Sequence, residues 1–220
     1  MSPLARASVY LHWKGVRSLF HQVHDELAIP RPYLKMPWPS FKRAHVKAFS
    51  EEEVRHLVKA CEYTVDKFHA GLSHVFHQRR PTAGRDKAMV LTLLDAGLRV
   101  GECLRLQIQD VDLATGEIIV APYGTGKKTR PRMVMLGITS RRAVWLYVAK
   151  LQGSDPFDRL LPLTPLAARP PLSRLGERVR VPNMHQHRLR HSFATRYLRG
   201  GEAVFTLQRL LGHSDLAMTN

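Results

Sequence analysis

The chain has 220 residues and a mass of 25.1 kDa, which is enough for one full domain and part of a second. With 44% hydrophobic and 24% charged residues, the composition excludes a disordered chain, a collagen-like repeat and a disulfide scaffold. Its 34 Lys and Arg residues against 18 Asp and Glu residues give a formal net charge of +16, which favours a nucleic acid as the partner.

Cysteine spacing and hydropathy narrow the class of protein further. Cys61 and Cys103 have no short paired spacing, so they predict neither a disulfide framework nor a cysteine zinc site. The sequence has no apolar run of about eighteen residues and no basic-then-apolar start, and so predicts neither a membrane span nor a signal peptide. We therefore expect a cytoplasmic protein with no membrane partner.

The N-terminal segment predicts one helix followed by a linker. Apolar residues recur there at alternating steps of four and three, which places them on one helical face: Val9, Trp13, Val16, Phe20, Val23 and Leu27. Little else in the first thirty residues can cover this face, so the helix needs a packing partner. Prolines then interrupt any helix, and basic residues surround them, so residues 29–48 are predicted to form an extended basic linker.

A second domain is predicted to begin with a helix at Ser50. Ser50 and Glu53 have the spacing of a capping box, and Phe49 and Val54 are placed to form a hydrophobic staple around it. This combination is typical of a helix N-terminus, so residues 49–220 are predicted to form the main domain.

The rest of the main domain predicts helices and one hairpin. The pattern indicates, in order, an apolar helix through Met89–Leu94 that ends at Gly97, a short helix through Cys103 and Leu106, a β-hairpin formed by residues 118–120 and 133–136, a helix around Ala143 and Leu146, a Pro-rich loop over Pro162–Pro171, and helices over Met184–Arg199 and Ala203–Leu211. The predicted fold class is mainly α with a small antiparallel β-sheet, an α+β domain.

Two segments far apart in the sequence contain no acidic residue. One lies between Glu117 and Asp155 and the other between Glu177 and Glu202, and both are rich in arginine. A charge run is more often a solvated face. If the fold brings these two segments together, however, they would line one phosphate-binding surface.

The segment 187–191, His-Arg-Leu-Arg-His, places His187, Arg190 and His191 on one helical face. An arginine fork suits two oxygens of a phosphate, and a nearby histidine exchanges a proton near neutral pH. For any one of these histidines alone, a helix cap or a backbone-bonded imidazole is the simpler interpretation. With His185 they approach zinc-ligand spacing, but the two arginines of the segment would repel a dication, so no metal is predicted.

The whole sequence resembles the tyrosine recombinases, also called phage integrases, because four motifs occur in the order found in that family: Gly97-Leu98-Arg99-Val100-Gly101-Glu102, Gly126-Lys127-Lys128-Thr129-Arg130, His187-Arg188-Leu189-Arg190-His191 and Leu210-Leu211-Gly212-His213. The resemblance implies a catalytic domain over residues 49–220, preceded by the last helix of a core-binding domain over residues 1–28. It further implies DNA recombination and integration, double-stranded DNA and a homo-tetramer as partners, no cofactor, and a bacterial or phage-derived, nucleoid-associated protein of a mobile element.

The resemblance also assigns roles in the chemistry. Arg99 and Arg190 would bind the non-bridging oxygens of the scissile phosphate, where preorganised guanidinium donors stabilise the charge of the transition state. Lys128 would protonate the departing 5′ oxygen. Because Pro131 and Arg132 look like an insertion in the hairpin, Lys127 is the alternative lysine.

The remaining motif residues would support the same reaction. His187 would assist proton transfer at the nucleophile, and His213 would donate a hydrogen bond to the phosphate. Glu102 and His191 would orient these groups. Four basic residues are expected to contact DNA: Lys127, Arg130, Arg132 and Arg188.

The family's attacking tyrosine lies a short distance beyond the histidine that matches His213, past Asn220, where this chain stops. Tyr197 is expected to pack on the Leu189 and Phe193 side of its helix. The chain is therefore expected to bind DNA without forming the 3′-phosphotyrosyl intermediate by itself. One interpretation is that the chain is a fragment of an active recombinase, and the alternative is a naturally truncated, inactive DNA-binding remnant. A third interpretation is a basic RNA-associated protein.

Overall fold

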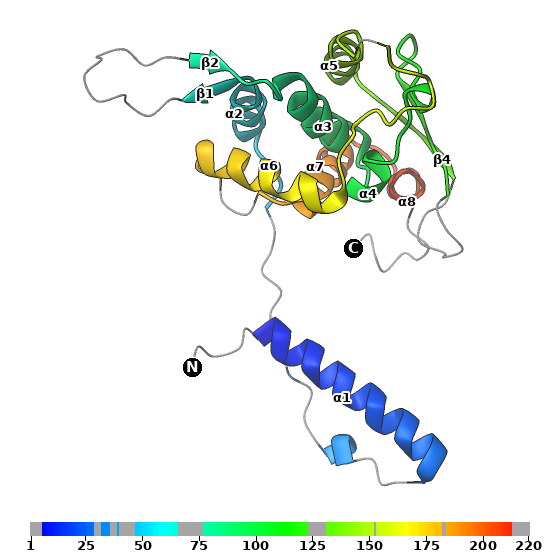
Figure 1. The fold of residues 1–220 in the computed structure, drawn as a ribbon. Coiled ribbons are helices and arrows are strands. Elements are labelled where there is room, and N and C mark those ends of the chain that lie inside the picture. Colours follow the sequence, from blue (N-terminus) through cyan, green and yellow to red (C-terminus); the bar gives the residue numbers. More distant parts are fainter. Residues whose placement is uncertain are drawn as a thin grey trace, which may run out of the picture. The chain divides into compact units, whose positions relative to one another are not determined.

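A computed structural model describes residues 6–28, 32–35, 39, 47–65, 77–122, 131–151, 153–181 and 184–212. The chain divides into two units, Met1–His45 and Val46–Asn220, which are described separately. The smaller unit consists of the long helix α1 (Arg6–Leu27) and the 3-10 turn η1 (Pro32–Lys35), which contacts it. Both are drawn in blue in Figure 1.

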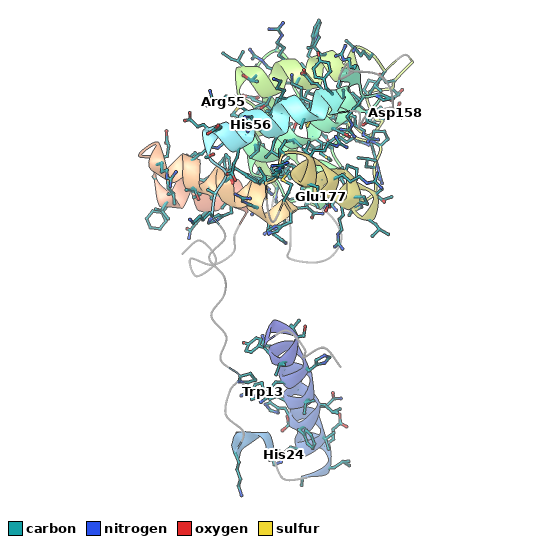
Figure 2. The ribbon with its side chains drawn as sticks, turned by 90° about the vertical axis from the view of Figure 1, so that its left-hand side faces the viewer. Trp13, His24, Arg55, His56, Asp158 and Glu177 are labelled. Atoms are coloured by element: carbon teal, nitrogen blue, oxygen red, sulfur yellow. The ribbon has the colours of Figure 1, made fainter. Side chains whose placement is uncertain are left out.

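Helix α1 is amphipathic, as the steps of four and three predict. Trp13 and Phe20 are half-buried, whereas Val9 and Leu27 are exposed at 42% and 68%. Figure 2 shows Trp13 and His24 projecting from this helix. The apolar face is thus only partly covered within its own unit.

The turn η1 lies inside the segment that the sequence predicts to be extended throughout. Its first residue, Pro32, has a φ fixed near the helical value, and a proline at that position loses no intrahelical hydrogen bond. The described part of the predicted linker therefore contains one helical turn.

Helix α3 lies at the centre of the larger unit (Figure 1). It contacts four other helices, so nearly all of its apolar residues are buried. The bounds of these elements are α2 (Glu51–Glu62), α3 (Ala83–Ala96), α4 (Val100–Cys103), α5 (Ile138–Val148) and α7 (Gln186–Arg199). The capping box of α2 is present as predicted, and Figure 2 shows Arg55 and His56 on the exposed side of that helix.

Gly97 ends α3, as the sequence predicts. It has the left-handed φ of 59°, which glycine adopts without steric cost. A Cβ at this position would also clash with the ring of Phe193 on α7. Both the backbone conformation and the close packing of α7 therefore require glycine here.

The larger unit also contains two small antiparallel hairpins: β1 (Tyr63–Val65) with β2 (His77–Arg79), and β3 (Glu117–Val120) with β4 (Arg132–Met135). The short 3-10 turn η2 (Ile108–Asp110) contacts β3. In the second hairpin Ile118 pairs with Val134, and both side chains are buried. This hairpin confirms the prediction, whereas the first hairpin is not among the elements predicted from the sequence.

The prediction of a Pro-rich loop over Pro162–Pro171 is wrong, because Pro165–Arg178 forms helix α6. Thr164 caps the helix by accepting a hydrogen bond from Ala167 N to its Oγ1, at 3.1 Å. Pro165 occupies the first helical position, where a backbone N–H has no intrahelical partner in any case.

Pro170 and Pro171 lie inside α6, where each removes one backbone hydrogen bond. The helix nevertheless forms because one of its faces is buried against the core. The free energy gained by burying apolar side chains offsets the missing hydrogen bonds. The buried residues of α6 are Ala168, Leu172, Leu175 and Gly176.

The C-terminal part confirms the two predicted helices, α7 and α8 (Val204–Leu211). Gly212 ends α8 with a left-handed φ of 63°. Tyr197 packs against Phe193 with 5.8 Å between ring centroids, on the predicted side of α7. The architecture is mainly helical with small antiparallel hairpins, which is the predicted fold class.

None of the helices that the structure describes combines the length and the apolar character needed to span a bilayer.

Candidate active site

The turn between α3 and α4 places Arg99 and Glu102 side by side. Arg99 precedes α4 with an extended backbone, and Glu102 turns back so that its Oε2 accepts a hydrogen bond from Arg99 N at 2.8 Å. Its Oε1 accepts a second hydrogen bond, from Arg99 Nη1 at 3.1 Å. The start of α4 thus fixes a guanidinium and a carboxylate together.

Three arginines surround Glu102, and these four residues are called the arginine cluster below. Arg132 Nη2 lies 2.7 Å from Glu102 Oε2, and Arg190 Nη1 lies 4.0 Å from the same oxygen. The side chains of Glu102, Arg132 and Arg190 are 1%, 6% and 11% exposed, whereas that of Arg99 is 36% exposed. The cluster is therefore most open to solvent at Arg99.

Burial and charge shift the pKa values within the arginine cluster. Burial would raise the pKa of Glu102, but hydrogen bonds from Arg132 and Arg99 and the charge of Arg132 outweigh it, so this pKa lies below its ordinary value. Burial and the nearby charge of Arg99 lower the pKa of Arg190 to about 10. Glu102 and Arg190 are therefore both charged at neutral pH. With three arginines around one carboxylate, the cluster has a net positive charge.

Backbone carbonyls orient Arg190. Its Nη1 donates to Gly97 O at 2.7 Å, and its Nη2 donates to Leu211 O. One guanidinium on α7 is thus held by the turn after α3 and by the last turn of α8. Guanidinium groups fixed in this way are suited to binding two oxygens of a phosphate and to stabilising developing negative charge.

The structure brings together Arg99, Arg190 and Glu102, three of the predicted site residues. It also brings together the two acid-free segments, because Arg132 comes from the first and Arg190 from the second. His187 and His191 are exposed on α7. Four predicted residues lie outside the described part of the chain: Lys127, Lys128, Arg130 and His213.

Arg188 is one of the expected DNA contacts, and its guanidinium is held inside the protein. The residue is 6% exposed, and its Nη2 lies 3.1 Å from Glu53 Oε1. Its Nε donates to Lys47 O at 2.9 Å, and the guanidinium carbon lies 3.9 Å from the ring centroid of Phe49. Arg188 therefore fastens the start of the larger unit to α7.

Arg132 is another of the expected DNA contacts, and its side chain is only 6% exposed. It is the first residue of β4 and pairs with Val120, so one of the two residues that look like an insertion in the hairpin belongs to a regular strand. Residues two apart on a strand share a face, and Val134 is buried. This alternation was the sequence signal that could have placed Arg132 on the inner face.

His185 has a structural role that the sequence did not reveal. It precedes α7, and its Nδ1 accepts a hydrogen bond from Arg188 N at 3.2 Å. Partial burial and the charges of His187 and Arg188 lower the pKa of His185, which favours the neutral ring that this bond requires. Within the described ranges, no three His, Cys, Asp or Glu side chains are grouped to hold a metal ion.

A family model described as the phage integrase family matches residues 47–220. The chain belongs to this family. The matched residues include all four residues of the arginine cluster, so the cluster lies within the part of the chain that matches the family.

Similar proteins agree with this assignment. The chain is 35% identical over 230 residues to tyrosine recombinase XerC of Bacillus subtilis, covering 98% of this chain and 69% of that protein. It is 31% identical over 186 residues to tyrosine recombinase XerA of Saccharolobus solfataricus, covering 84% of this chain and 55% of that protein. This chain thus spans only part of the length of these relatives.

A solved structure shows the same fold. The Tn1549 transposon integrase, determined in complex with a circular intermediate DNA, superposes with a TM-score of 0.74. The match covers 98% of this chain and 74% of that chain, at 18% sequence identity. This similarity confirms the tyrosine-recombinase-like fold of the larger unit.

Proposed function

We propose that this chain carries the phosphate-binding centre of a site-specific recombinase that cuts and rejoins DNA. The observation that carries the proposal is the convergence of Arg99 and Arg190 on Glu102 from distant parts of the larger unit. A net charge of +16 supports a DNA partner, and the integrase family supports strand transfer.

The proposed reaction uses the arginine cluster to stabilise a pentacoordinate phosphoryl transition state. A tyrosine hydroxyl attacks phosphorus, the 5′ oxygen leaves as a hydroxyl, and the reverse attack rejoins the strands. Arg99 and Arg190 bind the non-bridging oxygens, whose negative charge increases in the transition state.

The remaining roles follow the family resemblance and are part of the same proposal. Lys128, with Lys127 as the alternative, protonates the 5′ oxygen, His187 assists proton transfer at the nucleophile, and His213 donates a hydrogen bond to the phosphate. His191 supports these groups. Four copies would act together on two DNA duplexes.

The rejoining half of the reaction tests the proposal without relying on a tyrosine of the chain. Residues 1–220 first select their preferred duplex from a random DNA library. That duplex is then prepared with one strand ending in a 3′-p-nitrophenyl phosphate beside a strand with a free 5′ hydroxyl. Attack of the 5′ oxygen on phosphorus expels p-nitrophenolate, which is measured by its absorbance.

The protein is expected to accelerate this release, and Arg190→Ala is expected to slow it by about 10²- to 10³-fold, as when one preorganised donor to a reacting oxygen is removed. Arg196→Ala is the matched control, since Arg196 lies on α7 and donates to the backbone carbonyl of Leu94. No acceleration by the unaltered protein, or equal rates for folded Arg190→Ala and Arg196→Ala, would contradict the proposal.

A further inference from the structure

We propose that Arg132 is a positioning residue of the arginine cluster, which holds Glu102 and the end of α8 so that Arg99 and Arg190 can grip one phosphate. The inference rests on the proposed function of the cluster. It gives a specific role to a residue that the sequence placed among the DNA contacts.

The guanidinium of Arg132 joins two elements that are distant in sequence. Its Nη2 lies 2.7 Å from Glu102 Oε2, and its Nη1 lies 3.3 Å from Glu102 Oε1. Its Nε donates to Leu210 O at 2.6 Å. One planar group on β4 therefore bonds both oxygens of a carboxylate at α4 and a carbonyl of α8.

This geometry depends on the shape of the arginine side chain. A guanidinium offers several donors in a fixed plane, whereas a lysine ammonium is a compact charge on a flexible stem. Lysine at position 132 would keep the charge but could not reproduce all three contacts at once. With a side chain only 6% exposed, Arg132 is also poorly placed to touch DNA directly.

The last turn of α8 is held by two residues of the cluster. Arg132 donates a hydrogen bond to Leu210 O, and Arg190 donates one to Leu211 O. Carbonyls in the last turn of a helix have no intrahelical partner, and the helix dipole makes this end negative. The two guanidiniums therefore satisfy successive carbonyls and add a favourable charge interaction.

Gly212 leaves room for this arrangement. A Cβ at Gly212 would lie 3.1 Å from Arg132 Nη1, closer than ordinary van der Waals contact. Arg132 thereby links the arginines of the cluster to the C-terminal end of α8.

Loss of the Arg132 fork should let the Glu102 carboxylate rotate. Glu102 also receives hydrogen bonds from Arg99 N and Arg99 Nη1, so its rotation would displace the most exposed arginine of the cluster. Arg190 Nη1 lies 4.0 Å from the same carboxylate. Arg132 therefore acts on the phosphate through the other two arginines.

Inorganic phosphate is a suitable probe, because its binding needs neither a target sequence nor a nucleophile. Phosphate is titrated into residues 1–220 while the Nε–H resonances of Arg99 and Arg190 are followed by NMR. In the unaltered protein both resonances are expected to shift. Arg132→Lys is expected to weaken phosphate affinity about tenfold, as when a group that orients a binding side chain is lost.

Arg188→Lys is the matched control, because Arg188 is similarly buried and is paired with Glu53 rather than Glu102. It is expected to retain phosphate affinity. Thermal unfolding of each variant and amide exchange at Leu210 and Leu211 are measured alongside. Faster exchange at these two residues in Arg132→Lys alone would support the contact with α8.

Glu102→Gln distinguishes an effect of positioning from an effect of net charge. It also tests the inference if Arg132→Lys does not fold. Removing a negative charge would strengthen phosphate binding if only net charge mattered, whereas loss of positioning weakens it. Equal or higher phosphate affinity in Glu102→Gln would overturn the inference.

The other outcomes are also decisive. Unchanged phosphate affinity in Arg132→Lys, or an equal loss in Arg188→Lys, would overturn the role of Arg132 and leave the proposed function standing. If phosphate shifts neither Arg99 nor Arg190 in the unaltered protein, the proposed function itself fails, and the inference fails with it.

Discussion

Glu102 is ionised inside the protein because Arg132 and Arg99 hold its carboxylate with hydrogen bonds. Its side chain is 1% exposed, and burial by itself would favour the neutral acid. Hydrogen bonds from Arg132 and Arg99 reverse that preference and lower its pKa. The folded state therefore holds the carboxylate more strongly ionised than the unfolded chain does.

This difference predicts how the stabilising effect of Glu102 depends on pH. A carboxyl group with a lowered folded-state pKa stabilises fully above its unfolded pKa of about 4.3, and that contribution is lost as pH falls through the lower folded value. Glu102→Gln should therefore be less stable than the unaltered protein at pH 7, and the gap should narrow below about pH 4. Urea unfolding at each pH measures it; a gap that widens on acidification would contradict the prediction.

At the residue scale, the sequence shows which side chains are charged, but it does not show which of these charged side chains are buried. Arg99 and Arg190 are identified by their motifs, and the structure places both at Glu102. Arg132 and Arg188 look like DNA contacts in the sequence, but each is buried against a glutamate that lies far away in the chain. Pairing over such distances depends on the fold, so neither local spacing nor net charge reveals it.

Helix α6 shows that tertiary burial can override local breakers. Its two interior prolines predict a loop, yet the opposite side of the helix packs into the core. The glycine stops at Gly97 and Gly212 were predictable because a left-handed C-cap requires only local chemistry. The hairpin formed by β1 and β2 was not, because strands of three residues are too short to show an alternating pattern.

Replacing one interior proline of α6 should stabilise the protein. Pro170→Ala supplies an N–H for the carbonyl of Leu166, and we expect a gain of about 1–2 kcal/mol after subtracting the entropy that proline removes from the unfolded chain. Pro165→Ala is the matched control: at the first helical position it should only destabilise, by about 0.5–1 kcal/mol. Chemical denaturation measures both, and a loss of stability in Pro170→Ala equal to that of the control would contradict the prediction.

At the scale of the whole molecule, the fold brings together basic segments that are far apart in the sequence. The segments between Glu117 and Asp155 and between Glu177 and Glu202 meet at the arginine cluster through β4 and α7. A net charge of +16 attracts DNA over a distance, but it does not select one phosphate. In the proposed function, the guanidinium donors of Arg99 and Arg190, which the fold holds in place, select one phosphate.

The most direct test of a grip on a single phosphate removes that phosphate's charge. The duplex selected by residues 1–220 is made with one neutral methylphosphonate at each position in turn, and affinities are measured for the unaltered protein, Arg99→Ala and Arg190→Ala. Arg142→Ala, which changes an exposed arginine on α5, is the control.

The unaltered protein and Arg142→Ala should each lose about tenfold in affinity at one shared position. Arg99→Ala and Arg190→Ala should bind less tightly overall, and each should lose less affinity than the unaltered protein at that same position, because only one of the two arginines still contacts the phosphate. If the two variants show reduced sensitivity at different positions, or full sensitivity at every position, Arg99 and Arg190 do not share a phosphate and the central claim is wrong.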